Sequence, residues 1–425
     1  MMVFVLIVLA LLGMPLFAVV ALAALGGYWQ AGLDPLLASM TFVRIGELPL
    51  LVALPLFSFA GMLLARSRAP GRLLGLMQAM PGRLSGGAVF FVLIPCSLLT
   101  AFMATASVAV IVLGSLLLPV LIQNGHSRHF ALGVVTAGSS PGVLFAPSLP
   151  LILYAVVAQQ VAPRAALSIE ALFLAGLLPG LLILALMGGY AAWDHQGLPR
   201  GKGSRKPIGR ALRDNALELP LPFVILGGIY SGYLRVVDAA VIAAAWVLIT
   251  LVLVRRDIRP SKLPEIVTAA MMPVAAIVLV LGMSMASANV MIDAGVVQRL
   301  YEWLEPLVAS RLIFLLAVIA LLLAAGMMID IGAAVVILAP LIIPVATALG
   351  VDPVHLGIVS VVSLQIGYCT PPLANDPLLA GPRFERDIPT LHRAVLPFLA
   401  ILFVALLIIT AWPALSLALP SLFDA

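Results

Sequence analysis

The sequence predicts an all-α integral membrane protein, a polytopic bundle of about 10–12 transmembrane helices. Hydrophobic residues make up 63% of the 425 residues and charged residues only 10%, and the mean hydropathy is +1.20. Soluble domains are usually about 45–50% apolar and about 25% charged. Several apolar runs also reach the roughly 20 residues that a helix needs to cross a hydrocarbon core of about 30 Å. They do not alternate as the strands of a membrane β-barrel do.

A loose internal repeat supports this fold class and subdivides it. Residues 109–147 align with residues 334–372 at an offset of 225 positions, and the alignment includes four glycine or proline pairs: Pro119/Pro344, Gly125/Gly350, Gly142/Gly367 and Pro147/Pro372. Glycine and proline set backbone geometry, so these pairs mean more than matched leucines. Apolar segments interrupted at corresponding places in two halves are typical of secondary transporters. The alternative is two ordinary membrane helices broken by unrelated glycines and prolines.

The first half is expected to cover residues 1–200. Its predicted spans are 3–25, 48–64 and 167–193, and the stretch 86–123 reads as a span, a break and a second span. The hairpin and broken helix of this half should lie within 87–158. The run 1–26 has no basic leader or small-residue cleavage site, so it is interpreted as a retained first span.

A basic linker, 201–215, joins this half to a second half at 216–425. The predicted spans there are 219–234, 237–254, 267–291, 312–328, 330–349, 356–366 and 395–412. The second hairpin and broken helix should lie within 312–384. The amphipathic stretch 293–305 should lie in the membrane interface.

The net charge of +5 reflects membrane topology, because the basic residues cluster in short loops between apolar runs. The loops at 66–72, 194–215 and 255–259 should therefore be cytoplasmic. This distribution gives no indication of nucleic-acid binding. Cys96 and Cys369 lie in apolar segments without metal-ligand spacing and are interpreted as packing residues.

Two stretches cannot form regular helices. Residues 136–150 contain three prolines among glycines and hydroxyl side chains, and residues 367–377 contain three more prolines. Irregular backbone at membrane depth survives only where it is packed in protein or lines a wet cavity. Each stretch is therefore expected to be a re-entrant hairpin or an unwound helix at a binding site.

The whole chain resembles the large membrane subunit of tripartite ATP-independent periplasmic (TRAP) transporters. Residues 146–154 are similar to the family's P-P-S-I-P-x-x-x-Y element, and residues 326–330 are similar to its G-M-x-x-D element. The stretches 338–344 and 350–357, with Gly367 and residues 370–372, add a third anchor. The resemblance implies an inverted structural repeat and an elevator-type, sodium-coupled symporter of the bacterial inner membrane. It also implies a small four-helix membrane subunit and a periplasmic binding protein that delivers an organic anion, often a carboxylate.

The chain departs from the family pattern at three places. The family's G-x-S-G-S-x-x-x-D run has Met103 and Ala109 at its first serine and its carboxylate, and only Thr105 keeps a hydroxyl. The T-P-T-E motif is replaced by residues 235–238, and G-x-N after the second double proline reads as residues 374–376. These changes put one ion site and the usual substrate in question.

Sodium is a hard cation that takes oxygen ligands, which unwound backbone and hydroxyl side chains supply. Our candidate sodium ligands are Thr105, Thr136, Ser139, Ser140, Gly142, Asp330, Gly367 and Thr370. The structural alternative for each hydroxyl is a hydrogen bond to its own helix. For Asp330 it is an N-cap of the following helix, whereas burial of a carboxylate between apolar runs favours ion coupling.

The anionic substrate is expected at the half-helix N-termini that follow Pro147 and Pro372, where free backbone N–H groups attract negative charge. The candidate substrate residues are Pro147, Ser148, Pro371, Pro372, Asn375 and Asp376. Asp376 is expected to bind a cation or proton or to pair with a basic group. No cofactor is expected besides sodium as the coupling ion.

Three other functions stay open. A standalone ion-coupled anion carrier of the same superfamily would need no binding protein. A membrane enzyme is disfavoured, since the sequence has no H-E-x-x-H, no Asp-rich diphosphate motif and no Ser/His pair inside its spans. A non-transporting sensor or scaffold would follow if the two irregular stretches bound no ion.

Overall fold

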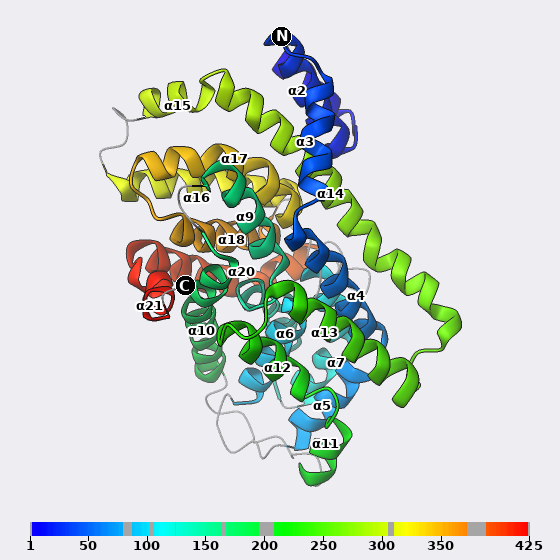
Figure 1. Ribbon diagram of the computed structural model, residues 1–425. Helices are drawn as coiled ribbons and strands as arrows, with labels where there is room; N and C mark the ends of the chain where they lie inside the picture. Colours follow the sequence, from blue (N-terminus) through cyan, green and yellow to red (C-terminus); the bar gives the residue numbers. More distant parts are fainter. Residues whose placement is uncertain are drawn as a thin grey trace.

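The computed structural model describes residues 2–79, 87–102, 106–123, 125–163, 167–194, 208–304, 310–371 and 388–423. Within these ranges the chain is helical and contains no strand (Figure 1). Eight described segments are long and apolar enough to cross a membrane: Pro49–Arg66, Arg128–Val161, Ile169–Asp194, Val236–Val254, Pro260–Asp293, Arg311–Met328, Ile331–Ala348 and Pro389–Ala411. Four shorter apolar helices accompany them. The all-α, multi-pass fold is thereby confirmed.

The helices of the first half follow the predicted order. They are α1 (Met2–Leu11), α2 (Leu16–Gln30), α3 (Leu36–Gly46), η1 (Pro49–Val52), α4 (Ala53–Arg66), α5 (Ala69–Ala79), α6 (Gly87–Ala101), α7 (Ala106–Gln123), α8 (Arg128–Ala137), η2 (Ser140–Leu144), α9 (Leu149–Val161) and α10 (Ile169–Asp194).

Helix α11 (Ile208–Asp214) lies in the linker 201–215. The helices of the second half are α12 (Pro220–Tyr230), α13 (Val236–Leu248), η4 (Ile249–Val254), η5 (Pro260–Lys262), α14 (Leu263–Asp293), α15 (Val296–Leu304), α16 (Arg311–Met328), α17 (Ile331–Ala348), α18 (Pro353–Cys369), α20 (Ile388–Ala411) and α21 (Ala414–Leu422).

The internal repeat is visible in the helix boundaries. Helices α7 and α17 both have 18 residues and begin 225 positions apart, and α8 and α18 begin at the same offset. A glycine with positive φ precedes each of the latter pair, Gly125 at 92° and Gly350 at 73°. Equivalent side chains, Ser127 and Asp352, then cap the helices by accepting backbone N–H bonds. The matched glycines and caps explain why the backbone turns and a new helix begins at the same position of each repeat half.

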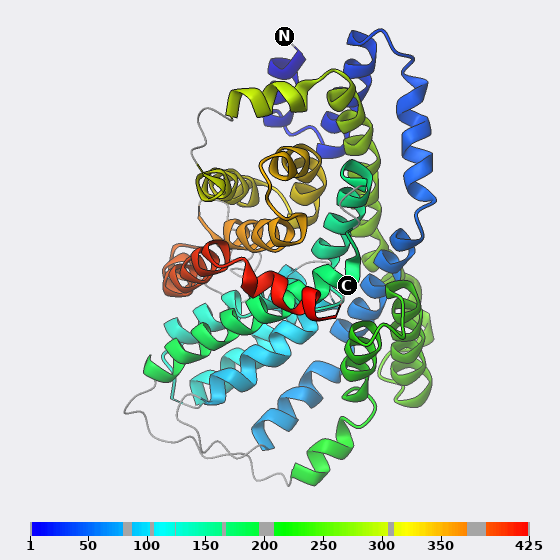
Figure 2. The same ribbon diagram turned by 60° about the vertical axis from the view of Figure 1, so that its left-hand side comes forward.

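The two halves interlock. Helix α20 of the second half packs against α8, α17 packs against α9, and α21 packs against α10. The α8–α20 crossing is close because Gly133 lies under the Ala394 carbonyl oxygen and the Phe398 ring, where a Cβ atom would clash. In Figure 2, α20 and α21 lie beside the helices of the first half. The first irregular stretch is therefore enclosed by helices from both halves, since η2 packs against α6 and α10 and also against α18.

A second layer flanks this core. The 31-residue helix α14 packs against α2, α3 and α4, and α4 also packs against α13 (Figure 1). Ser58 of α4 donates a hydrogen bond of 3.0 Å to the Ala270 carbonyl oxygen of α14. Helix α15 follows as the predicted amphipathic segment.

Three expectations about individual spans were wrong. The expected span 3–25 is two helices, because Gly13 takes a φ of 87° and Pro15 follows it. The expected span 219–234 contains α12, which has only 11 residues and so reaches about 17 Å. The chain does not finish with its last long span, because Pro413 starts the further helix α21.

Candidate functional site

The first irregular stretch is a broken helix buried in protein. Helix α8 ends at Ala137, the 3-10 turn η2 follows, and α9 begins at Leu149. Pro141 lies in the first turn of η2, where its missing N–H prevents α8 from continuing. In an apolar 18-residue stretch of the segment 128–161, 89% of the residues are buried. The irregular backbone is thus packed in protein, as expected at membrane depth.

The second stretch differs from the first in where the helix stops. We expected the break to include Gly367, but α18 continues to Cys369. Position 366, which aligns with Pro141, is an isoleucine with a backbone N–H, so the α-helical hydrogen bonds continue. Thr370 is the C-cap and Pro371 follows it. Gly367 instead allows a close helix crossing, since a Cβ atom there would clash with the Leu323 carbonyl oxygen of α16.

The two stretches meet inside the molecule. Gln365 of α18 donates from Nε2 to the Ser140 hydroxyl of η2 at 3.3 Å. Cys369 Sγ lies 4.0 Å from the same hydroxyl and 3.4 Å from Gln365 Nε2. Ser140 and Gln365 are 225 positions apart, so they are equivalent residues of the repeat. A contact between equivalent residues places this polar cluster, Ser140–Gln365–Cys369, where the two halves face each other.

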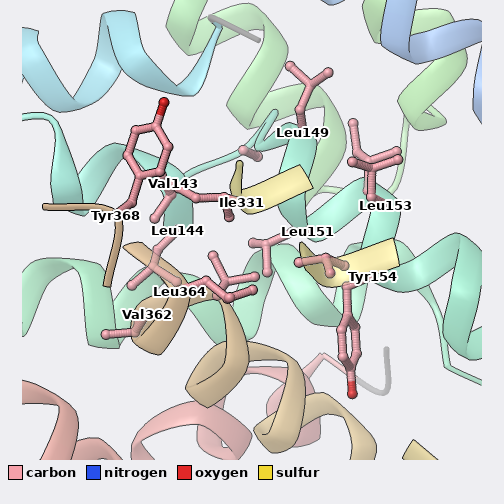
Figure 3. Close-up of a cluster of buried hydrophobic side chains, with 14 of the residues drawn as sticks. Val143, Leu144, Leu149, Leu151, Leu153, Tyr154, Ile331, Val362, Leu364 and Tyr368 are labelled. Carbon is pink, nitrogen blue, oxygen red and sulfur yellow. The ribbon is translucent and has the colours of Figure 1, made fainter. Parts of the chain in front are cut away.

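Apolar side chains of the elements that carry the polar cluster, and of α9 and α17, form a buried group. Figure 3 shows side chains of η2, α9, α17 and α18 packed together: Val143, Leu144, Leu149, Leu151, Leu153, Tyr154, Ile331, Val362, Leu364 and Tyr368. All ten are less than 9% exposed. A buried apolar environment strengthens electrostatic interactions, because its effective dielectric constant is low.

Two buried side-chain oxygen atoms, one on α8 and one on α18, have no hydrogen-bond partner among the described residues. They are Thr136 Oγ1, in the last turn of α8, and Gln365 Oε1. Thr136 is fully buried and Gln365 is 1% exposed. A buried unsatisfied polar group costs about 1–3 kcal/mol, and it can mark the place of an ion.

Most of the other expected hydroxyl groups bond to nearby backbone. Ser139 donates to the Thr136 carbonyl oxygen at 3.4 Å, and Thr370 donates to the Ile366 carbonyl oxygen at 2.6 Å. Ser148 caps α9, accepting from the Leu151 N–H and donating to the Val143 carbonyl oxygen. The oxygen lone pairs of these hydroxyl groups could still bind an ion. Their side-chain conformations are already explained by the hydrogen bonds to nearby backbone carbonyls.

The N-terminus of α9 offers fewer donors than expected. Position 150 is a proline, Ser148 Oγ accepts from Leu151 at 3.4 Å, and the Ser148 carbonyl accepts from Ile152 at 3.0 Å. Of the first four helical positions, only Leu149 keeps an N–H that neither group occupies. An anion at this N-terminus would therefore find little free backbone.

Asp330 is the N-cap of α17, the structural alternative stated above. Its Oδ1 accepts from the Gly332 N–H at 2.9 Å. The carboxylate lies in the two-residue gap between α16 and α17. No described residue of the Ser140–Gln365–Cys369 cluster bonds to it.

The remaining candidates are only partly placed. Gly142 packs against α6, where a Cβ atom would clash with the Ser97 carbonyl oxygen. Pro147 is buried in the connection before α9, after a cis peptide bond. Thr105, Pro372, Asn375 and Asp376 lie outside the described residues.

Sequence reasoning missed Gln365. The expected ligands were hydroxyls and glycines beside prolines, whereas Gln365 lies in a regular helical run. The signal was present in the repeat, because the offset of 225 that aligns Gly142 with Gly367 also aligns Ser140 with Gln365. A polar residue at both equivalent positions of an apolar repeat indicates contact across the two halves.

One departure from the family pattern has a simple structural role. Arg235 bonds Asp238 through Nε at 2.8 Å and through an Nη at 3.1 Å, before and within the first turn of α13. The hydrogen bonds that Arg235 donates to the Asp238 carboxylate raise the pKa of the guanidinium. The two residues form an i,i+3 ion pair at the start of the helix.

Comparisons with known proteins agree with this architecture. Residues 1–415 match the family model described as "Tripartite ATP-independent periplasmic transporter, DctM component". The chain is 31% identical to the C4-dicarboxylate TRAP transporter large permease protein DctM of Rhodobacter capsulatus, over 98% of this chain and 97% of that one. It is 32% identical to the isethionate TRAP transporter permease protein DctMQ of Oleidesulfovibrio alaskensis, over 95% of this chain and 63% of that one.

A solved structure shares the fold. The YdaH transporter of Alcanivorax borkumensis, described as having an unusual topology, superposes with a TM-score of 0.67. The match covers 88% of this chain and 87% of that one at 18% sequence identity.

Proposed function

Because the chain belongs to the DctM family of TRAP transporter large permeases, we propose that it imports a small organic anion, a carboxylate such as a dicarboxylate or sugar acid, driven by a sodium gradient. The substrate arrives on a periplasmic binding protein. A small four-helix membrane subunit completes the complex in the bacterial inner membrane. The broken helices move together across the bilayer in an elevator-type mechanism, as two inverted repeats.

The contact between the two halves at Ser140 and Gln365 is the observation that supports sodium coupling most strongly. Sodium prefers oxygen ligands. Gln365, whose amide bonds the Ser140 hydroxyl, and Thr136, four residues before Ser140, each keep a buried oxygen without a hydrogen-bond partner among the described residues. A sodium ion bound there would satisfy both oxygens. It would also join the two halves, because its ligands come from each.

The remaining expected ligands belong to the same proposal. Ser139 and the backbone around Gly142 adjoin this place in the chain. Thr105, Asp330, Gly367 and Thr370 would serve a second position at the other helix breaks.

The substrate class is supported by the relatives. The proteins named above are a C4-dicarboxylate permease and an isethionate permease, and both substrates are small organic anions. The occupied N-terminus of α9 gives little support for an anion held by backbone N–H groups there. Contacts at Pro147, Ser148, Pro371, Pro372, Asn375 and Asp376 remain part of the proposal.

Uptake into proteoliposomes tests this function. The full chain is reconstituted with its small subunit, and a loaded binding protein is added outside. Uptake of a labelled dicarboxylate or sugar acid should require an inward sodium gradient and should stop when potassium replaces sodium. Equal uptake in potassium would refute sodium coupling. Equal uptake without the binding protein would instead indicate a standalone carrier.

A further inference from the structure

A second site lies at the opposite end of the molecule from the N-terminus. Helices α5 and α11 pack together there, close to the end of η4 (Figures 1 and 2). An open pocket of about 590 Å³ lies there, and its lining includes four arginines, Arg68, Arg72, Arg213 and Arg255. Asp257 is the one carboxylate of that lining. Nothing in the proposed transport mechanism uses this arginine pocket.

Two of the arginines are fixed by buried carboxylates. Arg72 bonds Glu218 at 2.5 Å and Asp257 at 2.6 Å, and Arg255 bonds Glu218 at 3.1 Å. The side chains of Glu218 and Asp257 are only 5% and 7% exposed. Asn215 donates to the Arg72 carbonyl oxygen at 2.9 Å and holds the backbone of α5 in place. The base of the pocket is thereby rigid and electrically balanced.

The other two arginines carry unbalanced charge. Arg68 and Arg213 are exposed, and neither forms an ion pair with a described residue. With Arg72 and Arg255 neutralised by Glu218 and Asp257, the pocket keeps two positive charges. Guanidinium groups bind phosphate oxygens in a bidentate manner. The lining therefore suits a phosphate-bearing anion.

The surroundings favour a lipid over a soluble anion. The pocket adjoins the end of the candidate span Val236–Val254, and Val254 and Leu217 belong to its lining. Leu212 and Leu253 next to it are 48% and 64% exposed. Apolar side chains exposed beside arginines at the end of a span lie at the depth of the lipid head groups. The basic loops on this side should be cytoplasmic.

We propose that the pocket lined by Arg68, Arg72, Arg213 and Arg255 binds the phosphate of an anionic phospholipid of the cytoplasmic leaflet. Arg68 and Arg213 bind the phosphate oxygens. The ion pairs of Arg72 hold α5 against the start of α12 and the end of η4. The acyl chains extend along Val254 and Leu253.

Lipid binding to the full chain in detergent, measured by native mass spectrometry, tests this proposal. Phosphatidylglycerol should bind more tightly than phosphatidylcholine. The double substitution R68A/R213A should weaken phosphatidylglycerol binding about 25-fold, a factor of about 5 for each arginine near the membrane surface. The matched control is R210A/R259A, which removes the same charge from two exposed arginines outside the pocket lining. It should leave binding near the wild-type level.

Three results would overturn the proposal. Equal affinity of the wild-type chain for the two lipids would show no anion site. Equal loss in both double variants would show binding to surface charge alone. Displacement of the lipid by equimolar inorganic phosphate would show a site for a soluble anion. The first and third measurements use the wild-type chain, so they hold even if a variant fails to fold.

Discussion

At the residue scale, the polar cluster between the two halves is small. The Ser140 hydroxyl and the Gln365 amide meet across the repeat, and the free amide oxygen faces no described partner. The sequence indicated Ser140 through its proline and glycine neighbours. Composition did not indicate Gln365, which lies in a regular helical run. Only the offset of 225 in the repeat, which aligns Gln365 with Ser140, carried a signal for it.

Removing these oxygens should weaken sodium binding without unfolding the chain. We expect Gln365→Leu and Ser140→Ala each to raise the sodium concentration for half-maximal uptake about tenfold, as for the loss of one charge-assisted ligand. Ser363→Ala is the control, because Ser363 on the same helix is buried and donates only to the Val359 carbonyl oxygen. Sodium dependence that stays at the wild-type value in both test variants would contradict this role.

Asp330 allows its structural and coupling roles to be separated. Asp330→Ala removes the cap of α17 and should cost about 1 kcal/mol of stability, seen as a lower melting temperature. Asp330→Asn keeps an acceptor for the Gly332 N–H but removes the charge. If the carboxylate takes part in coupling, this variant should keep its melting temperature and lose sodium-dependent uptake. Full uptake by Asp330→Asn would leave Asp330 as a cap alone.

At the element scale, the two broken stretches share their starts and differ in their ends. The starts were predictable, since Gly125 and Gly350 and the caps after them repeat in sequence. The ends were not, because the helix stops at Pro141 and not at the aligned glycines Gly142 and Gly367. That proline ends the first helix, and α18 has Ile366 in its place.

The close crossing of α16 and α18 depends on paired glycines. Gly326 and Gly367 face each other, and a Cβ atom on either would clash with backbone of the other helix. Gly367→Ala should therefore destabilise the protein by about 1–3 kcal/mol, the usual cost of overpacking. Gly189→Ala, in the interior of α10 with open space around it, should stabilise by about 0.5–1 kcal/mol. A thermal melt compares them, and equal shifts in the same direction would contradict the crossing.

In the whole molecule, helices of one half pack against helices of the other. The repeat predicted two similar units, and two pairs of helices, α7 with α17 and α8 with α18, begin at its common offset. It did not predict that α20 covers α8 or that α21 covers α10. Those contacts depend on surface shape, as at Gly133, and on α21, whose nine residues after Pro413 are too short to be recognised as a span.

We infer that oxygen atoms from both halves hold a sodium ion where the halves meet. A cryo-EM structure of the full chain in sodium, compared with one in potassium, would show that ion. In sodium, density for an ion should appear among Ser140 Oγ, Thr136 Oγ1 and Gln365 Oε1, and it should be absent in potassium. Identical maps, with Ser140 and Gln365 bonded only to each other in both, would contradict the claim.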